Sequence, residues 1–239
     1  MADDLGPARA GGRQALLLQV WLSPSFPVGA FAYSHGLERA VEAGLVTGRA
    51  SLAAWMEDLL VYGSIRNDLI LLAAAWRAAS GAAWVEFDDI AELGAALQPS
   101  AERRLESVTQ GGAFLDAVAA AWPSPASHRR DRRAMLPSRP EIAYPIALAA
   151  AAAAHDIALE PLLEAYATAF IGNLASAAIR LGQIGQTDAQ RLIAGRLHAI
   201  GAAAEAARAS GLEDLGAATW SADLCSLEHE TQYTRLFRS

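Results

Sequence analysis

The sequence predicts an all-α protein that forms a single compact domain of about eight to ten helices over residues 1–239. Roughly a quarter of the residues are alanine, which has the highest helix propensity. Apolar residues recur at the three- and four-residue spacing of helices, and the alternation typical of half-buried strands is nearly absent. A chain of 239 residues is long enough to bury a core without disulfide bonds, and its single cysteine, Cys225, fits a reducing cytoplasm.

In the first half of the chain, the helices are predicted from apolar spacing and from the breakers that separate them. Residues 1–13 are polar and glycine-rich, and we expect them to form a flexible N-terminus. The first helix is expected to end at the prolines of the segment SPSFP. Asp88 or Asp89 is expected to cap one helix, and Ser100 to cap the next. The expected helices are 14–22, 32–43, 51–80 (as one helix or two), 88–97 and 101–121.

The second half contains one obvious loop, residues 122–141, which is rich in proline, serine and arginine. Thr187 and Gln190 have the spacing of a capping box. A glycine-rich linker over 211–216 leads into the C-terminal tail. The expected helices are 142–155, 160–181 and 187–210.

Composition excludes several function classes. The chain contains no lysine. It therefore lacks the lysine on which P-loop proteins, kinases, Schiff-base enzymes and pyridoxal phosphate enzymes depend. A net charge of −7 and a pI near 5.2 disfavour nucleic acid as a partner. The N-terminus does not resemble a signal peptide, and the most apolar run, 142–154, falls short of the roughly 20 residues that span a membrane. We expect a soluble cytoplasmic protein with neither a nucleic-acid nor a membrane partner.

Polar residues are densest in the segment SPSFPVGAFAYSHGLERAVEAG, residues 23–44. The sequence AYSHG around Ser34 is close to the nucleophile elbow of α/β hydrolases, so a small serine hydrolase is the alternative function. That elbow needs a preceding strand, for which FPVGAF is too short. A tight turn that caps the next helix and a partner-binding surface are the other two interpretations.

Metal ligands are scattered along the chain. The five histidines are never four apart, and the pair His229–Glu230 lacks a second histidine nearby. We therefore expect no tight metal site and no bound cofactor, although a weak or interfacial site that uses Cys225, His229 or His35 stays open.

The C-terminus carries large apolar side chains at Tyr233, Leu236 and Phe237, between arginines. Chain ends are ordinarily polar and frayed, whereas aromatic residues and arginine are enriched in binding hot spots. This pattern indicates an interaction segment over residues 229–239.

Two blocks of the sequence, residues 23–44 and 229–239, are similar to the UreF family of urease accessory proteins. Residues 23–44 resemble the family's N-terminal signature, and HETQYTRLFRS (229–239) its C-terminal one. The segment ERRLESVTQG (102–111) is similar to the family's central helix. One block, residues 180–190, departs from the family pattern: Gln183 and Ala189 replace the family's usual proline and glycine. Gly182 and Gly185 are expected to break the helix there.

The resemblance implies an all-α, dimeric, non-enzymatic protein. Such proteins bridge UreD (also called UreH) and the GTPase UreG, regulate that GTPase, and are required for nickel insertion into the urease apoprotein. Partner contacts are then expected at Tyr33, Ser34, His35, Glu38, Arg180, Gln186, His229, Glu230, Tyr233, Arg235, Leu236, Phe237, Arg238 and Ser239.

Overall fold

Helices supply every regular element in residues 7–123 and 141–239, the part of the chain that this computed structural model describes. The all-α prediction is confirmed. Two 3₁₀ turns, Ala30–Ala32 and Leu212–Asp214, lie between helices. The α-helices are α1 (Pro7–Trp21), α2 (Leu37–Glu42), α3 (Arg49–Tyr62), α4 (Ser64–Ser80), α5 (Trp84–Ala96), α6 (Ala101–Ala121), α8 (Tyr144–Ala154), α9 (Leu159–Arg180), α10 (Gln186–Ala209) and α11 (Trp220–His229).

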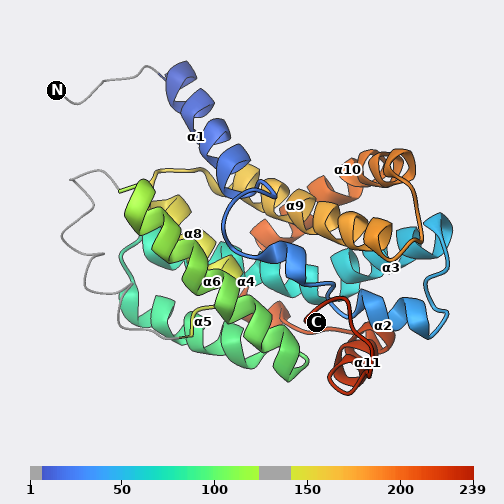
Figure 1. The fold of residues 1–239 in the computed structure, drawn as a ribbon. Helices are drawn as coiled ribbons and strands as arrows, with labels where there is room; N and C mark the ends of the chain where they lie inside the picture. The colour runs from blue at the N-terminus through green and yellow to red at the C-terminus, as the bar shows by residue number, and fades with distance from the viewer. Residues whose placement is uncertain (1–6, 124–140) are drawn as a thin grey trace.

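The core is built around α8, against which α4 and α6 pack (Figure 1). Every residue of α8 from Pro145 to Ala154 is buried. A helix that is apolar on all sides is stable only inside a protein, and alanine side chains let its neighbours approach closely. The most apolar run of the sequence is therefore the central helix of the fold.

Two other helical stretches, Arg49–Ser80 and Leu159–Arg180, have the length and mean hydropathy of a membrane span. Within the fold, 67% and 56% of these windows are buried. Burial of this extent is typical of core helices that pack against other parts of their own chain.

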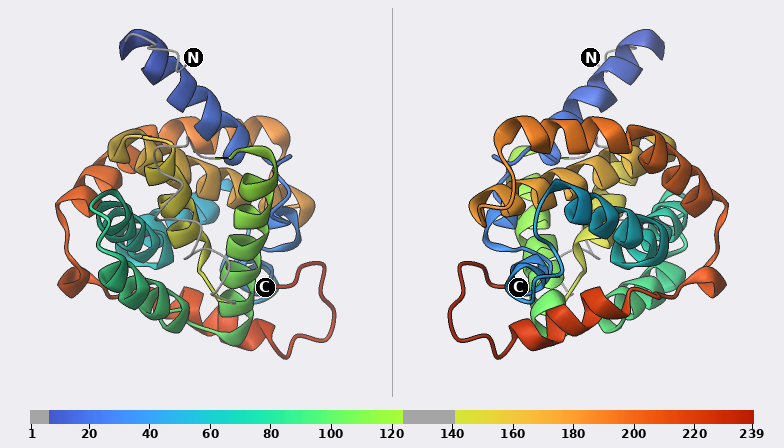
Figure 2. Two further views of the ribbon diagram at one scale, coloured as in Figure 1. Left: turned by 90° about the vertical axis from the view of Figure 1, so that its left-hand side faces the viewer. Right: turned by 90° about the vertical axis from the view of Figure 1, so that its right-hand side faces the viewer.

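The N-terminal helix is longer than expected. It begins at Pro7, where a proline suits the first helical turn because it has no N–H to leave unbonded. Residues 7–13 of the N-terminus that was expected to be flexible therefore lie within this helix, and residues 1–6 lie outside the described residues. Figures 1 and 2 show α1 projecting from the helical body. The predicted loop also lies largely outside the described residues, over 124–140.

Backbone geometry explains two further boundaries. The helix expected from residue 32 begins only at Leu37, because His35 and Gly36 have φ of 56° and 75°. These left-handed values are incompatible with a continuous right-handed helix. At Gly63 the chain breaks between α3 and α4, so residues 51–80 form two helices.

Of the three helix caps predicted from the sequence, one is confirmed. Ser100 caps α6, and its Oγ accepts a hydrogen bond from Arg103 N. Asp88 and Asp89 do not begin α5, which starts at Trp84, so that prediction is wrong. The capping box at Thr187 is also wrong: α10 starts at Gln186 behind Gly185, without a side-chain cap.

Candidate functional site

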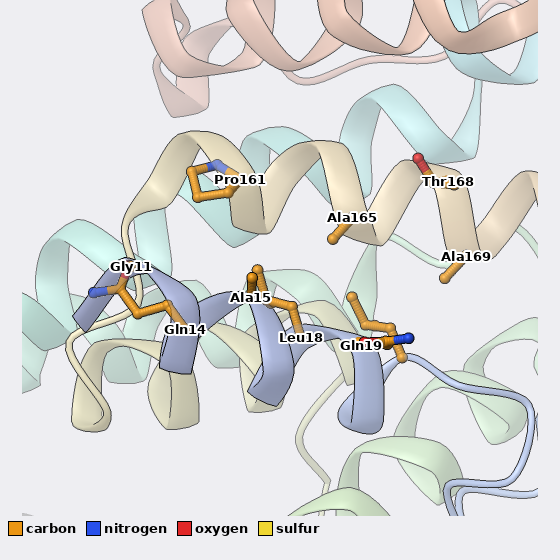
Figure 3. A pocket seen from close by; sticks show the side chains of 10 residues that line it. Gly11, Gln14, Ala15, Leu18, Gln19, Pro161, Ala165, Thr168 and Ala169 are labelled. Carbon is orange, nitrogen blue, oxygen red and sulfur yellow. The ribbon is translucent and has the colours of Figure 1, made fainter. Parts of the chain in front are cut away.

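One groove of the molecule is apolar and lies between α1 and α9 (Figure 3). It has a volume of about 570 Å³. The polar side chain of Thr168 on its wall is already bonded to the Glu164 carbonyl. No charged side chain lines this groove, so it offers hydrophobic contact rather than acid–base chemistry. Its lining residues are Gly11, Gln14, Ala15, Leu18, Gln19, Leu22, Pro161, Ala165, Thr168 and Ala169.

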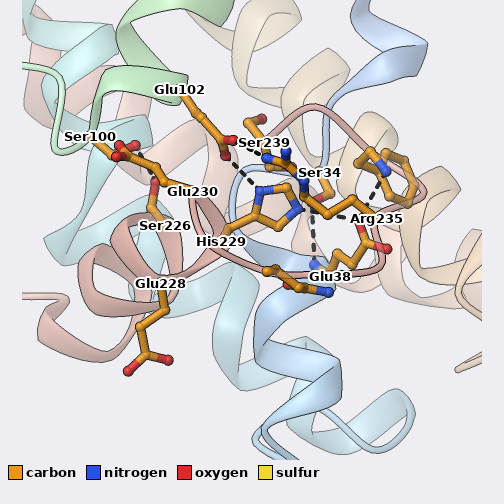
Figure 4. Close-up of polar contacts among 12 residues, drawn as sticks. Ser34, Glu38, Ser100, Glu102, Ser226, Glu228, His229, Glu230, Arg235 and Ser239 are labelled. Carbon is orange, nitrogen blue, oxygen red and sulfur yellow. Dashed lines mark hydrogen bonds and ion pairs between the residues drawn. The ribbon is translucent and has the colours of Figure 1, made fainter.

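Polar contacts concentrate instead where residues 230–239, the C-terminal segment, return to α2 after a wide loop (Figures 2 and 4). Arg238 N donates to the Ala32 carbonyl at 2.8 Å, and Ser34 N donates to the Ser239 carbonyl at 2.9 Å. The two sequence blocks that carried the family resemblance therefore lie side by side, although about 200 residues separate them in the chain.

Four side chains, the C-terminal cluster, hold this segment: Glu38, Glu102, His229 and Arg235. His229 Nε2 lies 3.2 Å from Glu38, and Nδ1 lies 2.6 Å from Glu102. Arg235 contacts the other oxygen of Glu102 at 2.6 Å. His229 is fully buried, and each of its two ring nitrogens faces a carboxylate.

The same segment and the helix before it, α11, are tied to the start of α6. Glu230 accepts a hydrogen bond from Ala101 N at 2.8 Å, and Ser226 bonds to Ser100 at 2.6 Å (Figure 4). A carboxylate at a helix N-terminus satisfies a free N–H and faces the positive end of the helix dipole. The predicted site residue Glu230 thus bonds to the N-terminus of α6.

Ser34 links the two chain segments and is no hydrolase nucleophile. Its Oγ donates to the Ser239 carbonyl and accepts from Glu38 N at 3.2 Å. The residue with positive φ is His35 rather than Ser34, and a 3₁₀ turn rather than a strand precedes them. The alternative of a serine hydrolase is therefore wrong, because a nucleophile elbow needs a strand and an adjacent base.

Arg180 also has a place at this junction. Its guanidinium lies between two aromatic rings, 3.6 Å from the Phe31 centroid and 4.0 Å from the Phe237 centroid. It donates a hydrogen bond to the Phe31 carbonyl as well. Stacking on both faces uses the planar, delocalised charge of arginine, so Arg180 clamps the C-terminal segment to the loop before α2.

The fourteen predicted partner-contact residues differ in exposure. Six of them are buried within the protein itself, where they anchor the C-terminal segment. Those buried are Tyr33, Ser34, Glu38, His229, Phe237 and Ser239. Those exposed are Gln186, Tyr233, Arg235, Leu236 and Arg238, while His35, Arg180 and Glu230 are partly buried.

The altered block over residues 180–190 has a simple geometry. Gly182 adopts φ of 72° directly after α9, which is the usual conformation of a residue that ends a helix. Gln183 donates a side-chain hydrogen bond to the Leu181 carbonyl. The expected break at Gly182 is confirmed, and Gln186 is exposed at the start of α10.

Sequence reasoning missed a second buried group, the Arg103 cluster: His35, Asp68, Arg103, Glu106 and Tyr166. Arg103 bonds to Glu106 and to His35 Nδ1, and Tyr166 donates to Asp68 at 2.7 Å. Ser239 Oγ donates to Glu106 at 2.6 Å, which joins this cluster to the C-terminal segment. The signal was present on α6, whose buried stripe carries polar residues where a core helix has apolar ones.

A cavity of about 420 Å³ borders the Arg103 cluster. Its lining includes His35, Asp68, Arg103 and Glu106, and further residues come from the segment 22–31 and from α6, α8, α9 and α10. The buried charges of the cluster therefore have room for water beside them.

Burial shifts two pKa values in the Arg103 cluster in directions that favour neutral groups. Desolvation raises the pKa of Asp68 to about 6, against the opposing effect of Arg103. Desolvation and the nearby Arg103 charge lower the pKa of His35 well below its usual value. His35 is accordingly neutral and stacks on Phe170, with ring centroids 4.2 Å apart.

Replacing Asp68 by asparagine is expected to change how stability depends on pH. Because the pKa of Asp68 is raised from 3.8 to about 6 on folding, the folded state binds more protons than the unfolded state between these values. The contribution of Asp68 to the free energy of unfolding then falls as pH rises from about 4 to about 6, by up to about 3 kcal/mol. Asparagine does not titrate, so Asp68→Asn gains stability relative to the wild type over that window.

Urea unfolding at several pH values from 4 to 7 measures this difference. His35 acts in the opposite direction, because a lowered pKa makes stability fall in acid, but it is common to both proteins. A difference between Asp68→Asn and the wild type that stays constant with pH would contradict the assignment.

The candidate metal ligands are engaged elsewhere. Both nitrogens of His229 face carboxylates, and His35 Nδ1 accepts from Arg103. Burial, followed by the charge of Glu228, raises the pKa of the Cys225 thiol, which disfavours the thiolate that binds metals. Within residues 7–123 and 141–239, no three His, Cys, Asp or Glu side chains are grouped to hold a metal ion.

The fold and the site define a class of protein: an all-α domain in which buried ion pairs hold the chain's own C-terminal segment in place. The UreF family model matches residues 46–198. A urease accessory protein UreF from Methylobacterium radiotolerans is 50% identical over 95% of this chain and 97% of its own length. The corresponding protein of Xanthobacter autotrophicus is 48% identical over 98% of this chain and 97% of its own length. That of Bradyrhizobium diazoefficiens is 45% identical over 100% of this chain and 96% of its own length.

The chain belongs to the UreF family of urease accessory proteins. It is accordingly an accessory protein and not an enzyme.

Proposed function

We propose that this protein is a cytoplasmic, homodimeric scaffold that bridges UreD and the GTPase UreG. In this role it is required for nickel insertion into the urease apoprotein and regulates the GTPase cycle of UreG. Family membership supports the assignment to urease assembly. The observation that carries the scaffold role is the C-terminal segment, which is anchored from within but exposes Tyr233 and 61% of Leu236.

The exposed side chains have the composition of a binding site. Tyr233 is fully exposed, and Arg235, Leu236 and Arg238 are exposed beside it. Large apolar side chains and arginines on a fixed backbone bind partners with little loss of conformational entropy. A scaffold of this kind changes the activity of a GTPase by binding one of its nucleotide states more tightly than the other.

Co-expression tests the proposal directly. Tagged protein is expressed with UreD, UreG and the urease subunits, and urease activity is assayed after nickel addition. We expect a complex that contains UreD and UreG, and a loss of both complex and urease activity when this chain is omitted. Full activity without the chain would refute the proposal. Light scattering of the purified protein tests the dimer.

Two neighbouring aromatic residues should separate binding from folding. Phe237→Ala removes a side chain that is 4% exposed and should lower the free energy of unfolding by about 3 kcal/mol. Tyr233→Ala removes a fully exposed ring, so stability should change by less than about 0.5 kcal/mol. It should nevertheless weaken the complex with UreD and UreG by about tenfold or more.

Thermal denaturation and a pull-down on both variants provide the comparison. Equal binding by the wild type and Tyr233→Ala would place the partner surface elsewhere on the molecule.

A further inference from the structure

Glu38 carries an unusual set of hydrogen bonds for a buried carboxylate. Its Oε1 accepts from Leu236 N at 2.7 Å, and its Oε2 accepts from Phe237 N at 2.9 Å. His229 Nε2 lies 3.2 Å from the same Oε2. These three donors belong to the last eleven residues of the chain, and Glu38 itself lies on α2, about 190 residues earlier.

Two consecutive backbone N–H groups on the two oxygens of one carboxylate fix a register. The backbone bends at residues 236 and 237, which lets two consecutive N–H groups reach the same carboxylate, and here Phe237 is buried while Leu236 is exposed. A slip of one residue would exchange the two side chains and place the leucine in the aromatic contact with Arg180. Adjacent contacts, Arg238 N to Ala32 and Ser34 N to Ser239, continue the same register.

The electrostatics favour this arrangement. The only salt-bridge partner of Glu38 in the described residues is His229, which Glu102 shares on its other nitrogen. Backbone N–H groups therefore supply most of the hydrogen bonds that a buried carboxylate requires. Displacing the C-terminal segment would break both of these backbone hydrogen bonds at once, and hydrogen bonds to a charged group are among the stronger ones, so the carboxylate stabilises the seated segment.

We propose that Glu38 is a positioning residue that sets the register of the C-terminal segment, so that Leu236 and Tyr233 face the partner protein. It acts through the backbone of residues 236–237 and does not touch the partner. The inference rests on the proposed function, because it concerns how the scaffold presents its binding side chains.

Amide hydrogen exchange tests the register without any partner. The full-length variants Glu38→Ala and Glu38→Gln are compared with Glu42→Gln, which alters a half-exposed carboxylate on the same helix. We expect the amides of Leu236 and Phe237 to exchange at least tenfold faster in Glu38→Ala. The increase should be smaller in Glu38→Gln, which keeps one acceptor oxygen, and absent in Glu42→Gln.

Thiol labelling distinguishes a lost register from general unfolding. Cys225, the only cysteine, is 3% exposed and should stay unreactive in both Glu38 variants. In a Cys225→Ser background, Leu236→Cys should react much faster than Phe237→Cys. Adding Glu38→Ala should bring the two rates toward each other. Glu38→Gln serves the same comparison if Glu38→Ala does not fold.

Affinity for UreD in the presence of UreG completes the test. We expect about a tenfold loss in Glu38→Ala and no loss in Glu42→Gln. Unchanged exchange at Leu236 and Phe237 would overturn the inference, whether or not affinity falls. If the wild type binds neither protein, the proposed function fails, while exchange and labelling still decide the role of Glu38.

Discussion

Replacing Arg103 by methionine is expected to lower the free energy of unfolding by about 3–5 kcal/mol. Arg103 is 4% exposed, and its guanidinium bonds to Glu106, which is 1% exposed. Asp68 lies close enough for its charge to be felt by the same guanidinium. Methionine fills much of the same volume but leaves two buried carboxylates without a cation, and burial of unpaired charge is among the most costly changes in a protein.

The next residue of α6 is a matched control. Arg104 forms an ion pair with Glu141, but both side chains are about half exposed. Water screens such a pair, so Arg104→Met should cost less than about 1 kcal/mol. Urea unfolding at neutral pH, followed by circular dichroism, measures both variants. Similar losses at the two positions would show that the Arg103 cluster does not depend on its guanidinium.

The double variant Arg103→Met with Glu106→Gln extends this test. The second change removes one of the stranded charges, so the pair should be more stable than Arg103→Met alone. A double variant that is less stable by the full sum of both single effects would mean that the two side chains act independently.

Alanine at Gly111 should be the second strongly destabilising change. A Cβ built on Gly111 overlaps the Ile142 carbonyl oxygen and lies 3.1 Å from the carbonyl carbon of Ala143. The obstacle is backbone rather than a movable side chain, so α6 and the entry to α8 must separate. We expect a loss of about 1–3 kcal/mol or more.

Alanine at the next residue, Gly112, should have the opposite effect on the free energy of unfolding. A Cβ there meets nothing within 4 Å, and alanine is the better helix former. Gly112→Ala should therefore raise the free energy of unfolding by about 0.5–1 kcal/mol. Thermal denaturation of the two variants side by side checks the sign of each change. A stable Gly111→Ala protein would show that α6 and α8 are not in close contact.

The local sequence predicted the helices well, but it predicted their exact ends poorly. Ser100 was correctly identified as a cap, because its hydroxyl bonds to an N–H three residues later and requires no distant partner. Asp88 has the same capping chemistry and lies inside α5. At Ala101 the free N–H is satisfied by Glu230, which comes from the far end of the chain, and no local pattern predicts that contact.

The sequence singled out two blocks as a candidate site, but it did not predict how these blocks contact each other. The residues of both signature blocks do meet, with Ser34 against Ser239 and Glu38 against Phe237. Their side chains were expected to face a partner, and Ser34 and Glu38 instead bond to the C-terminal segment of the same chain. Chemical type alone does not tell whether a carboxylate binds another protein or its own backbone.

The sequence by itself determined the all-helical class, the alanine-rich helix after residue 142 and the family, because these follow from composition, periodicity and contiguous motifs. Only the tertiary structure decided which side of the C-terminal segment is exposed, and only it revealed the Arg103 cluster. Burial and hydrogen bonding at these sites depend on groups that are distant in the chain, such as Ser239 and Glu106. The path of the backbone between them, rather than any local pattern, brings such groups together.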